Sequence, residues 1–280
     1  MKITPSAFSD FHFPCLRTLV ATGTVGALCA IIPLIKYAPI DDLIATFPNS
    51  TPSHTIAQLY AALATATMSD GPPSLLHLSC DKSLANTLID PPSVTFAIHG
   101  TQLRSLFHFQ FLTFVELSAP AGFDLDNATV ADMALAWPHL QTLELRASNY
   151  THVKPRVTLG GLLPLAQYCL KLRSLHMSFD ASTVPEWETL KTSAKKKKRV
   201  RQDQFQKLHV AQSPVEKSLA VAAFLSSVFP KLNSITTDLD QNPAHNSNAL
   251  RKNWKAVELV IPVLRNVRAE EKYWTGRGRH

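Results

Sequence analysis

Charged and imidazole side chains recur at fixed positions inside short runs of aliphatic residues. In Leu112–Leu117 and Leu140–Leu145, aliphatic residues alternate with polar ones, so that Glu116 and Glu144 occupy equivalent places. Successive side chains of a β-strand point to opposite faces, and the aliphatic and polar sets therefore separate onto two faces. Carboxylates, imidazoles and a guanidinium on one such face can bind a polar partner through hydrogen bonds and ion pairs.

The equivalent positions in the other runs extend this candidate binding face. We expect adjacent runs to place Glu116 beside Glu144 and His176 beside His209. The alternative is an ordinary solvated sheet face without a partner. The predicted partner-binding residues are His77, Phe114, Glu116, Thr142, Glu144, Arg146, Ser174, His176, Lys207 and His209.

Patterns typical of enzymes and metal sites are missing from the sequence. Only nine glycines are present, Gly160-Gly161 suits a turn rather than a phosphate loop, and no serine lies in a nucleophile elbow. The eleven histidines are dispersed, without a pair at helical metal-binding spacing. We therefore predict no enzyme, no catalytic residue, no metal ligand and no cofactor.

Asp124, Asp126 and Asn127 match part of a calcium-binding loop. The glycine and the glutamate that such a loop requires at its sixth and twelfth positions are absent, so helix capping is favoured.

A basic run is the strongest local charge signal. It contributes six of the +7 formal charges, and the rest of the chain is near neutral, so nucleic acid is not the expected partner. The run can be a nuclear import signal, a contact for a polyanion, or a solvated insertion spanning 183–204. Its cations are Lys195, Lys196, Lys197, Lys198, Arg199 and Arg201.

The aliphatic runs are copies of one phrase: an aromatic or apolar residue, often a proline, then Leu and two further aliphatics at fixed spacing. Measured between Leu112, Leu140, Leu172, Phe205 and Leu232, the copies follow one another at intervals of 28, 32, 33 and 27 residues. Leucine-rich repeats have this spacing within the phrase and periods of roughly 20–29 residues, so these are long, irregular copies. The six copies begin at Phe13, Leu112, Trp137, Leu170, Phe205 and Phe229.

Helical patterns separate the repeated strands. Apolar stripes predict one helix over 127–137 and a second over 159–169, with Thr158 as the cap of the second. Ser213–Glu216 matches a capping box, which predicts the start of a third helix that ends at Phe229 and has Leu219 on its inward face. The first hundred residues are less regular. We expect there a helix over 55–68, strands over 40–47, 75–78 and 94–98, and a helical or irregular segment over 103–109. At the C-terminus we expect a last unit over 254–260, a capping helix over 261–274 and a frayed tail over 275–280.

One segment could instead anchor the chain in a membrane. Leu19–Ile35 is uncharged for 17 residues, which is short for a spanning helix, and repeat logic favours a strand followed by a helix. The four cysteines lack metal-ligand spacing and predict reduced thiols in the cytoplasm or nucleus.

The order of several motifs resembles the leucine-rich-repeat region of fungal F-box proteins of the mushroom type. The resemblance is good over residues 100–275 and loose over residues 10–100. An F-box is not recognisable, and this suggests either a truncated gene model or a repeat-only paralogue. It implies a substrate receptor of a cullin-based ubiquitin ligase, with a Skp1-type adaptor as partner only if an F-box is supplied or cryptic. The motifs are Gly122–Val130, Ala136–Leu143, Val157–Leu159, Cys169–Leu172, Phe179–Ser182, Ser213-Pro214, Phe224-Leu225 and Phe229–Leu232.

Together these observations predict an α/β leucine-rich-repeat solenoid over 1–274, curved, with a parallel concave sheet and convex helices. Its N-terminal units (10–100) are irregular, its later units (100–274) are clearer, and 275–280 form a disordered tail. We expect a monomeric, non-membrane, non-enzymatic module that binds a protein target on the concave face, in the cytoplasm, the nucleus or both. The alternative is a nuclear scaffold or polyanion-binding protein acting through 195–201.

Overall fold

The protein is of the mixed α/β class, with parallel strands separated by helices. The computed structural model describes residues 13, 15–35, 37–65, 73–81, 94–147, 154–186, 200–238 and 248–277. The chain forms two compact units, one of residues 1–125 and 136–154 and one of residues 126–135 and 155–280. Each unit is described separately below.

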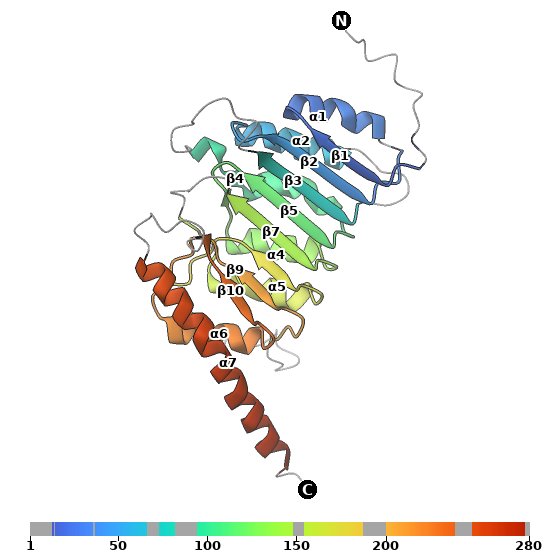
Figure 1. Ribbon diagram of the computed structural model, residues 1–280. Coiled ribbons are helices and arrows are strands. Elements are labelled where there is room, and N and C mark those ends of the chain that lie inside the picture. Colours follow the sequence, from blue (N-terminus) through green and yellow to red (C-terminus); the bar gives the residue numbers. More distant parts are fainter. Residues whose placement is uncertain are drawn as a thin grey trace, which may run out of the picture. The chain divides into compact units, whose positions relative to one another are not determined.

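Five parallel strands form the main sheet of the first unit (Figure 1). Their spatial order follows the sequence, and equivalent residues of the repeated phrase pair directly, as Leu76 with Val115 and Leu117 with Leu145 do. The strands are β1 (Thr18–Thr22), β2 (Asp42–Pro48), β3 (Leu75–Asp81), β5 (Phe114–Ala119) and β7 (Thr142–Ala147). Strands β4 (Ile98–His99) and β6 (Phe123–Asp124) pair separately.

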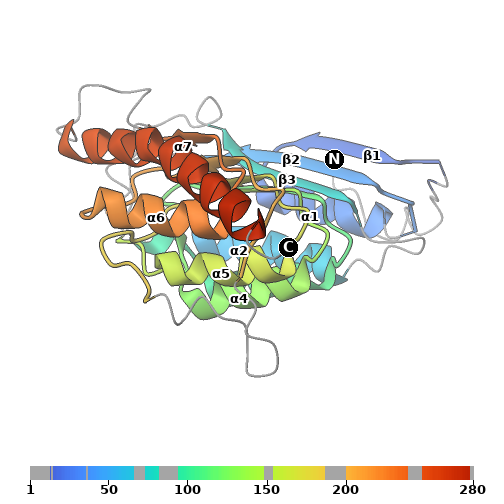
Figure 2. The same ribbon diagram turned by 90° about the horizontal axis from the view of Figure 1, so that it is seen from below.

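Helices cover one face of this sheet. Figures 1 and 2 show α1 (Val25–Ile31) and α2 (Ser53–Thr65) on the same side of β1, β2 and β3. The strand aliphatics on that side, such as Phe47, Leu76 and Leu117, are fully buried because the helices remove them from water. The shorter helical segments of the unit are η2 (Ile32–Ile35), η3 (Val94–Phe96), α3 (Gly100–Leu103) and η4 (Arg104–His108).

The second unit contains three short parallel strands and its own helices. Strand β9 lies between β8 and β10, and α6 and α7 lie side by side (Figures 1 and 2). Its strands are β8 (Ser174–His176), β9 (Lys207–His209) and β10 (Ser234–Thr236). Its helices are α4 (Asn127–Ala136, whose last residue belongs to the first unit), η5 (Leu159–Gly161), α5 (Leu162–Tyr168), α6 (Ser218–Val228) and α7 (Asn248–Arg277).

Each unit buries one indole whose N–H is hydrogen-bonded. In the first unit Trp137 donates to the Leu106 carbonyl at 3.3 Å, and in the second Trp254 donates to the Ser213 carbonyl at 2.7 Å. Both side chains are at most 1% exposed. Large aromatic residues contribute much of the apolar burial in a core, and a bonded N–H removes the cost of burying their polar atom.

Most of the predicted elements are present. All six copies of the phrase contain a parallel strand, and the predicted strands at 40–47 and 75–78 correspond to β2 and β3. The predicted helices at 127–137, 159–169 and 55–68 correspond to α4, to η5 with α5, and to α2. Leu19–Ile35 forms β1, α1 and η2, and among the described residues no helix is both long and apolar enough to cross a membrane.

The predicted capping box at Ser213 is wrong. Ser213 is fully buried. Its hydroxyl donates to the Val210 carbonyl, and the same oxygen accepts from the Phe179 amide, so this oxygen bonds Phe179 rather than an amide of a helix that follows. Helix α6 therefore starts at Ser218, five residues later. This changes which residues face inward, and Leu219 is 65% exposed.

Other corrections concern helix ends. Residues 254–260 form no strand unit, because Trp254, Val257 and Ile261 are the buried face of the single helix α7, which also includes residues 275–277. Thr158 precedes η5 but makes no capping bond with its side chain. Residues 94–96 are a 3₁₀ turn rather than a strand, whereas 104–108 are helical as expected.

Candidate partner-binding face

The polar residues predicted for the first unit lie on the sheet face opposite α1 and α2. His77 pairs with Glu116, and Glu116 pairs with Glu144, across the parallel strands β3, β5 and β7. Phe114 pairs with Thr142 in the next row, and Arg146 pairs with Ser118. The predicted residues are partly or fully exposed, in contrast to Ser118 and to the aliphatics that alternate with them, which are buried.

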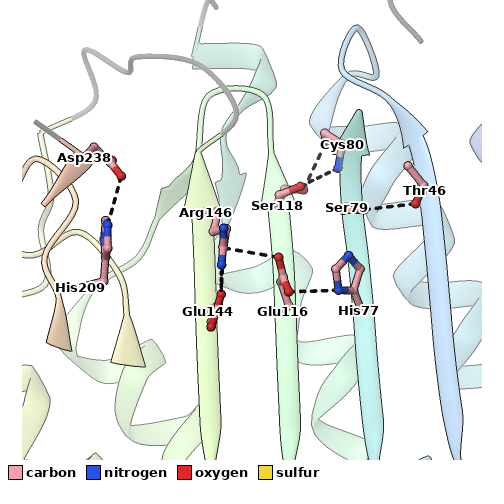
Figure 3. A network of polar contacts seen from close by, with 10 residues as sticks. All are labelled: Thr46, His77, Ser79, Cys80, Glu116, Ser118, Glu144, Arg146, His209 and Asp238. Atoms are coloured by element: carbon pink, nitrogen blue, oxygen red, sulfur yellow. Dashed lines mark hydrogen bonds and ion pairs between the residues drawn. The ribbon is translucent and has the colours of Figure 1, made fainter. Parts of the chain in front are cut away.

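Four of these side chains form a continuous polar network (Figure 3). His77 Nδ1 lies 3.0 Å from Glu116 Oε2, and Arg146 Nε lies 3.4 Å from Glu116 Oε1. Arg146 also donates to Glu144, with Nε 2.8 Å from Oε2. We call His77, Glu116, Glu144 and Arg146 the charged row. The row contains two carboxylates, one guanidinium and one imidazole.

Glu116 is held ionised at the centre of this row. The hydrogen bond from His77 lowers the pKa of Glu116 from its ordinary value of 4.5, and the charges of His77 and Arg146 lower it further, while partial burial opposes the shift. The Glu116 side chain is 16% exposed, whereas that of Arg146 is 47% exposed. An approaching ligand therefore meets the guanidinium first, with fixed carboxylates beside it.

A row of small hydroxyl residues lies next to the charged row. Thr46 and Ser79 are hydrogen-bonded at 3.2 Å, and the Cys80 amide donates to Ser118 Oγ at 2.5 Å (Figure 3). These contacts bind neighbouring strands together through side chains as well as through the backbone. Thr46 and Ser79 add partly exposed hydroxyl groups to the polar face of the first unit, whereas Ser118 is buried.

In the second unit the predicted pair His176 and His209 is confirmed. The residues are direct partners on β8 and β9, and their rings stack with centroids 3.7 Å apart. Ser174 pairs with Lys207 one row away, and Lys207 is exposed. Sequence reasoning missed Asp238, whose Oδ1 lies 3.5 Å from His209 Nε2 (Figure 3). Its only signal was its place two residues after the last residue of β10.

Only the end of the basic run falls within the described part of the chain. Arg201 is exposed and pairs with Asp203 at 2.8 Å, whereas Lys195, Lys196, Lys197, Lys198 and Arg199 lie outside the described residues. The predicted solvated insertion is wrong at its C-terminal end. Val200 is 6% exposed and Gln202 is 1% exposed, and the Gln202 side-chain amide bonds the Leu172 carbonyl and the Phe205 amide.

The three calcium-like residues have structural partners. Asp126 accepts hydrogen bonds from the Thr129 amide and hydroxyl at the start of α4, Asn127 bonds Thr158, and Asp124 pairs with His99. The preference for capping is thus confirmed at Asp126. The bonds to Thr129 also lower the pKa of the Asp126 carboxyl.

All four cysteines are free thiols, from exposed Cys15 to buried Cys169. Burial raises the pKa of Cys169 to about 12, so this thiol is protonated and unreactive at neutral pH. No protein-family model matches the chain, and no curated protein matches its sequence.

Proposed function

We propose that this protein is a non-enzymatic recognition module of the leucine-rich-repeat type, and that it binds a protein target on the polar faces of its parallel strands. The charged row is the observation that carries the proposal. It places ion-pairing groups in register on three neighbouring strands, on the face that α1 and α2 leave uncovered.

The chemistry of the row favours a protein partner. Fixed carboxylates beside an accessible guanidinium can accept and donate directed hydrogen bonds, and arginine is common where interfaces concentrate their binding energy. Phe114, half-buried on the same face, adds apolar contact area. Such mixed surfaces suit protein interfaces, whose compositions combine polar groups with aromatic anchors.

The resemblance to mushroom-type F-box proteins suggests what happens to the bound target. The target would be presented for ubiquitin transfer if a Skp1-type adaptor joins the complex. The basic run 195–201 supplies an import signal in this reading, which places the function in the nucleus as well as the cytoplasm.

Affinity purification from cell extract with quantitative mass spectrometry tests the proposal. The full chain is compared with the double variant Glu144→Gln/Arg146→Gln and with Glu216→Gln, an exposed carboxylate of the second unit outside the strands. We expect the double variant to lose specific proteins at least about tenfold while Glu216→Gln retains them, because losing a charge pair at an interface costs several kcal/mol.

An identical set of captured proteins for all three forms would overturn binding through the charged row. The same data are read for Skp1 and cullin. Their enrichment supports the ubiquitin-ligase form of the proposal. Their absence, with a target still captured, leaves a stand-alone binding module.

A further inference from the structure

Two imidazoles and one carboxylate converge at the end of β9 in the second unit. His176 and His209 stack face to face, and the Asp238 carboxylate reaches the edge of the His209 ring. One potential ligand atom from each of the three residues lies within 4.8 Å of the others. None of the three has a place in the network of the first unit.

We propose that His176, His209 and Asp238 form a binding site for a divalent transition-metal ion such as Zn²⁺. Neutral imidazole nitrogens and a carboxylate oxygen are the donors that Zn²⁺ and its first-row neighbours prefer, whereas Ca²⁺ and Mg²⁺ favour oxygen ligands alone. This inference does not depend on the proposed target-binding function.

The distances require only side-chain movement. Ligand atoms about 2.1 Å from one ion stand roughly 3–3.5 Å apart, so the three groups must approach by about 1–1.5 Å. The side chains of His209 and Asp238 are 20% and 37% exposed, which leaves room for the rotations that bring them together.

In the metal-free chain, one turn holds two of the three groups close to each other. Ala211 has a φ of 48°, a left-handed conformation that is uncommon for a residue with a side chain. In this conformation its amide donates to His209 Nδ1 at 3.2 Å, and its carbonyl accepts from the Asp238 amide at 3.4 Å. The turn therefore sets the positions of the imidazole and the carboxylate relative to each other.

Metal binding also determines which ring nitrogen of His209 carries the proton. A neutral imidazole carries one N–H, and the amide of Ala211 now occupies the Nδ1 lone pair. Coordination at Nε2 places the ring proton on Nδ1, so the hydrogen bond from Ala211 opens when the ion binds. Three protein ligands leave at least one coordination position for water or for a group of a bound molecule.

Isothermal titration of the chelator-stripped full chain with ZnCl₂ tests the site. We expect about one equivalent of Zn²⁺ and at least tenfold weaker binding in each of the variants His176→Gln, His209→Gln and Asp238→Asn. His77→Gln is the matched control, since it alters a histidine that faces a carboxylate at 3.0 Å without a second imidazole. Its affinity should equal that of the unaltered chain.

A measurement on the unaltered chain keeps the test valid if a variant fails to fold. Carbethoxylation mapped by mass spectrometry should show that Zn²⁺ protects His176 and His209 but not His77. The near-ultraviolet spectrum of the Co²⁺ form should lack thiolate charge-transfer bands. Absence of Zn²⁺ binding, equal affinity in all variants, unprotected His176 and His209, or thiolate bands would each overturn the proposal.

Discussion

At the scale of single residues, polar side chains bond backbone groups of neighbouring segments. Gln202 shows this most fully: its amide N–H groups reach the carbonyls of Cys169, Leu170 and Leu172, and its carbonyl accepts from the amides of Gln204 and Phe205. One buried side chain therefore adds hydrogen bonds to several backbone groups of the turns, including the Cys169 carbonyl, which also accepts from the Leu172 amide.

Replacing Gln202 by Leu should lower the free energy of unfolding by about 3 kcal/mol, because several buried hydrogen bonds to backbone carbonyls and amides are lost. Chemical denaturation measures the change. Gln204→Leu, two residues away and exposed, should stay within about 0.5 kcal/mol of the unaltered chain. Equal effects of the two substitutions would contradict this role for Gln202.

Glu116 gives a prediction about pH. Its pKa is lower in the folded chain than in the unfolded chain, so its ionisation stabilises the fold above the unfolded value and this contribution disappears as pH falls through the folded value. Removing the hydrogen bond with His77→Ala should raise the pKa of Glu116, measured by NMR titration of its side-chain carbonyl.

The matched control is His54→Ala, an exposed histidine on α2 of the same unit. It should leave the pKa of Glu116 unchanged. A Glu116 pKa that does not move in His77→Ala would mean that Arg146 alone keeps the carboxylate ionised.

At the scale of elements, the sequence predicts strands more reliably than helix starts. The alternation of residues alone predicts a strand phrase. The strand aliphatics of the later copies, such as Leu143, Leu175 and Leu208, are buried, whereas Leu19 in the first copy is only partly buried. The predicted start of α6 relied on Ser213 as the cap. The Ser213 hydroxyl instead bonds the Val210 carbonyl and the amide of Phe179, which lies 34 positions earlier in the chain. Local sequence cannot reveal such competition for a polar group.

The same limit explains the candidate sites. Strand register follows from the phrase, so the pairs Glu116–Glu144 and His176–His209 could be predicted. Asp238 could not, because its position depends on the left-handed turn at Ala211, a residue type with no preference for that conformation. Gln202 was likewise missed because it follows a highly charged, apparently solvated run.

The start of η5 offers a prediction at this scale. A Cβ on Gly161 would lie 2.4 Å from Asn127 Oδ1 and 2.9 Å from Val157 Cγ1, although its φ of −65° suits any residue. Gly161→Ala should therefore displace Asn127, break its bonds to Thr158 and lower the free energy of unfolding by about 1–3 kcal/mol.

Gly160→Ala is the control within the same turn. Its Cβ would meet its nearest neighbours at 3.5 Å and 3.6 Å, which is ordinary contact. Its stability should remain within about 0.5 kcal/mol of the unaltered chain. A Gly161→Ala chain of unchanged melting temperature would show that Asn127 can move without cost.

At the scale of the whole molecule, charge is concentrated in one short segment. Replacing the six cations between Lys195 and Arg201 with glutamine reduces the formal charge from +7 to +1. This variant should elute from a heparin column at clearly lower salt, because each lost cation removes a contact whose strength depends on counterion release.

A variant with Lys207→Gln, Lys217→Gln and Lys231→Gln, three exposed lysines outside the run, is the comparison. It should shift elution much less. A shift about half that of the six-residue variant, in proportion to the three charges removed, would mean that polyanion binding follows net charge and that the run has no special role in it.

The two buried indoles allow the unfolding of each unit to be followed by tryptophan fluorescence. Trp137 lies in the first unit and Trp254 in the second, each in an apolar environment, while Trp274 is 66% exposed. With the other three tryptophans replaced by phenylalanine, a chain retaining one of these indoles emits at short wavelength until its own unit opens. Fluorescence from the two single-indole chains would therefore report, along one denaturant series, whether the units melt together or in succession.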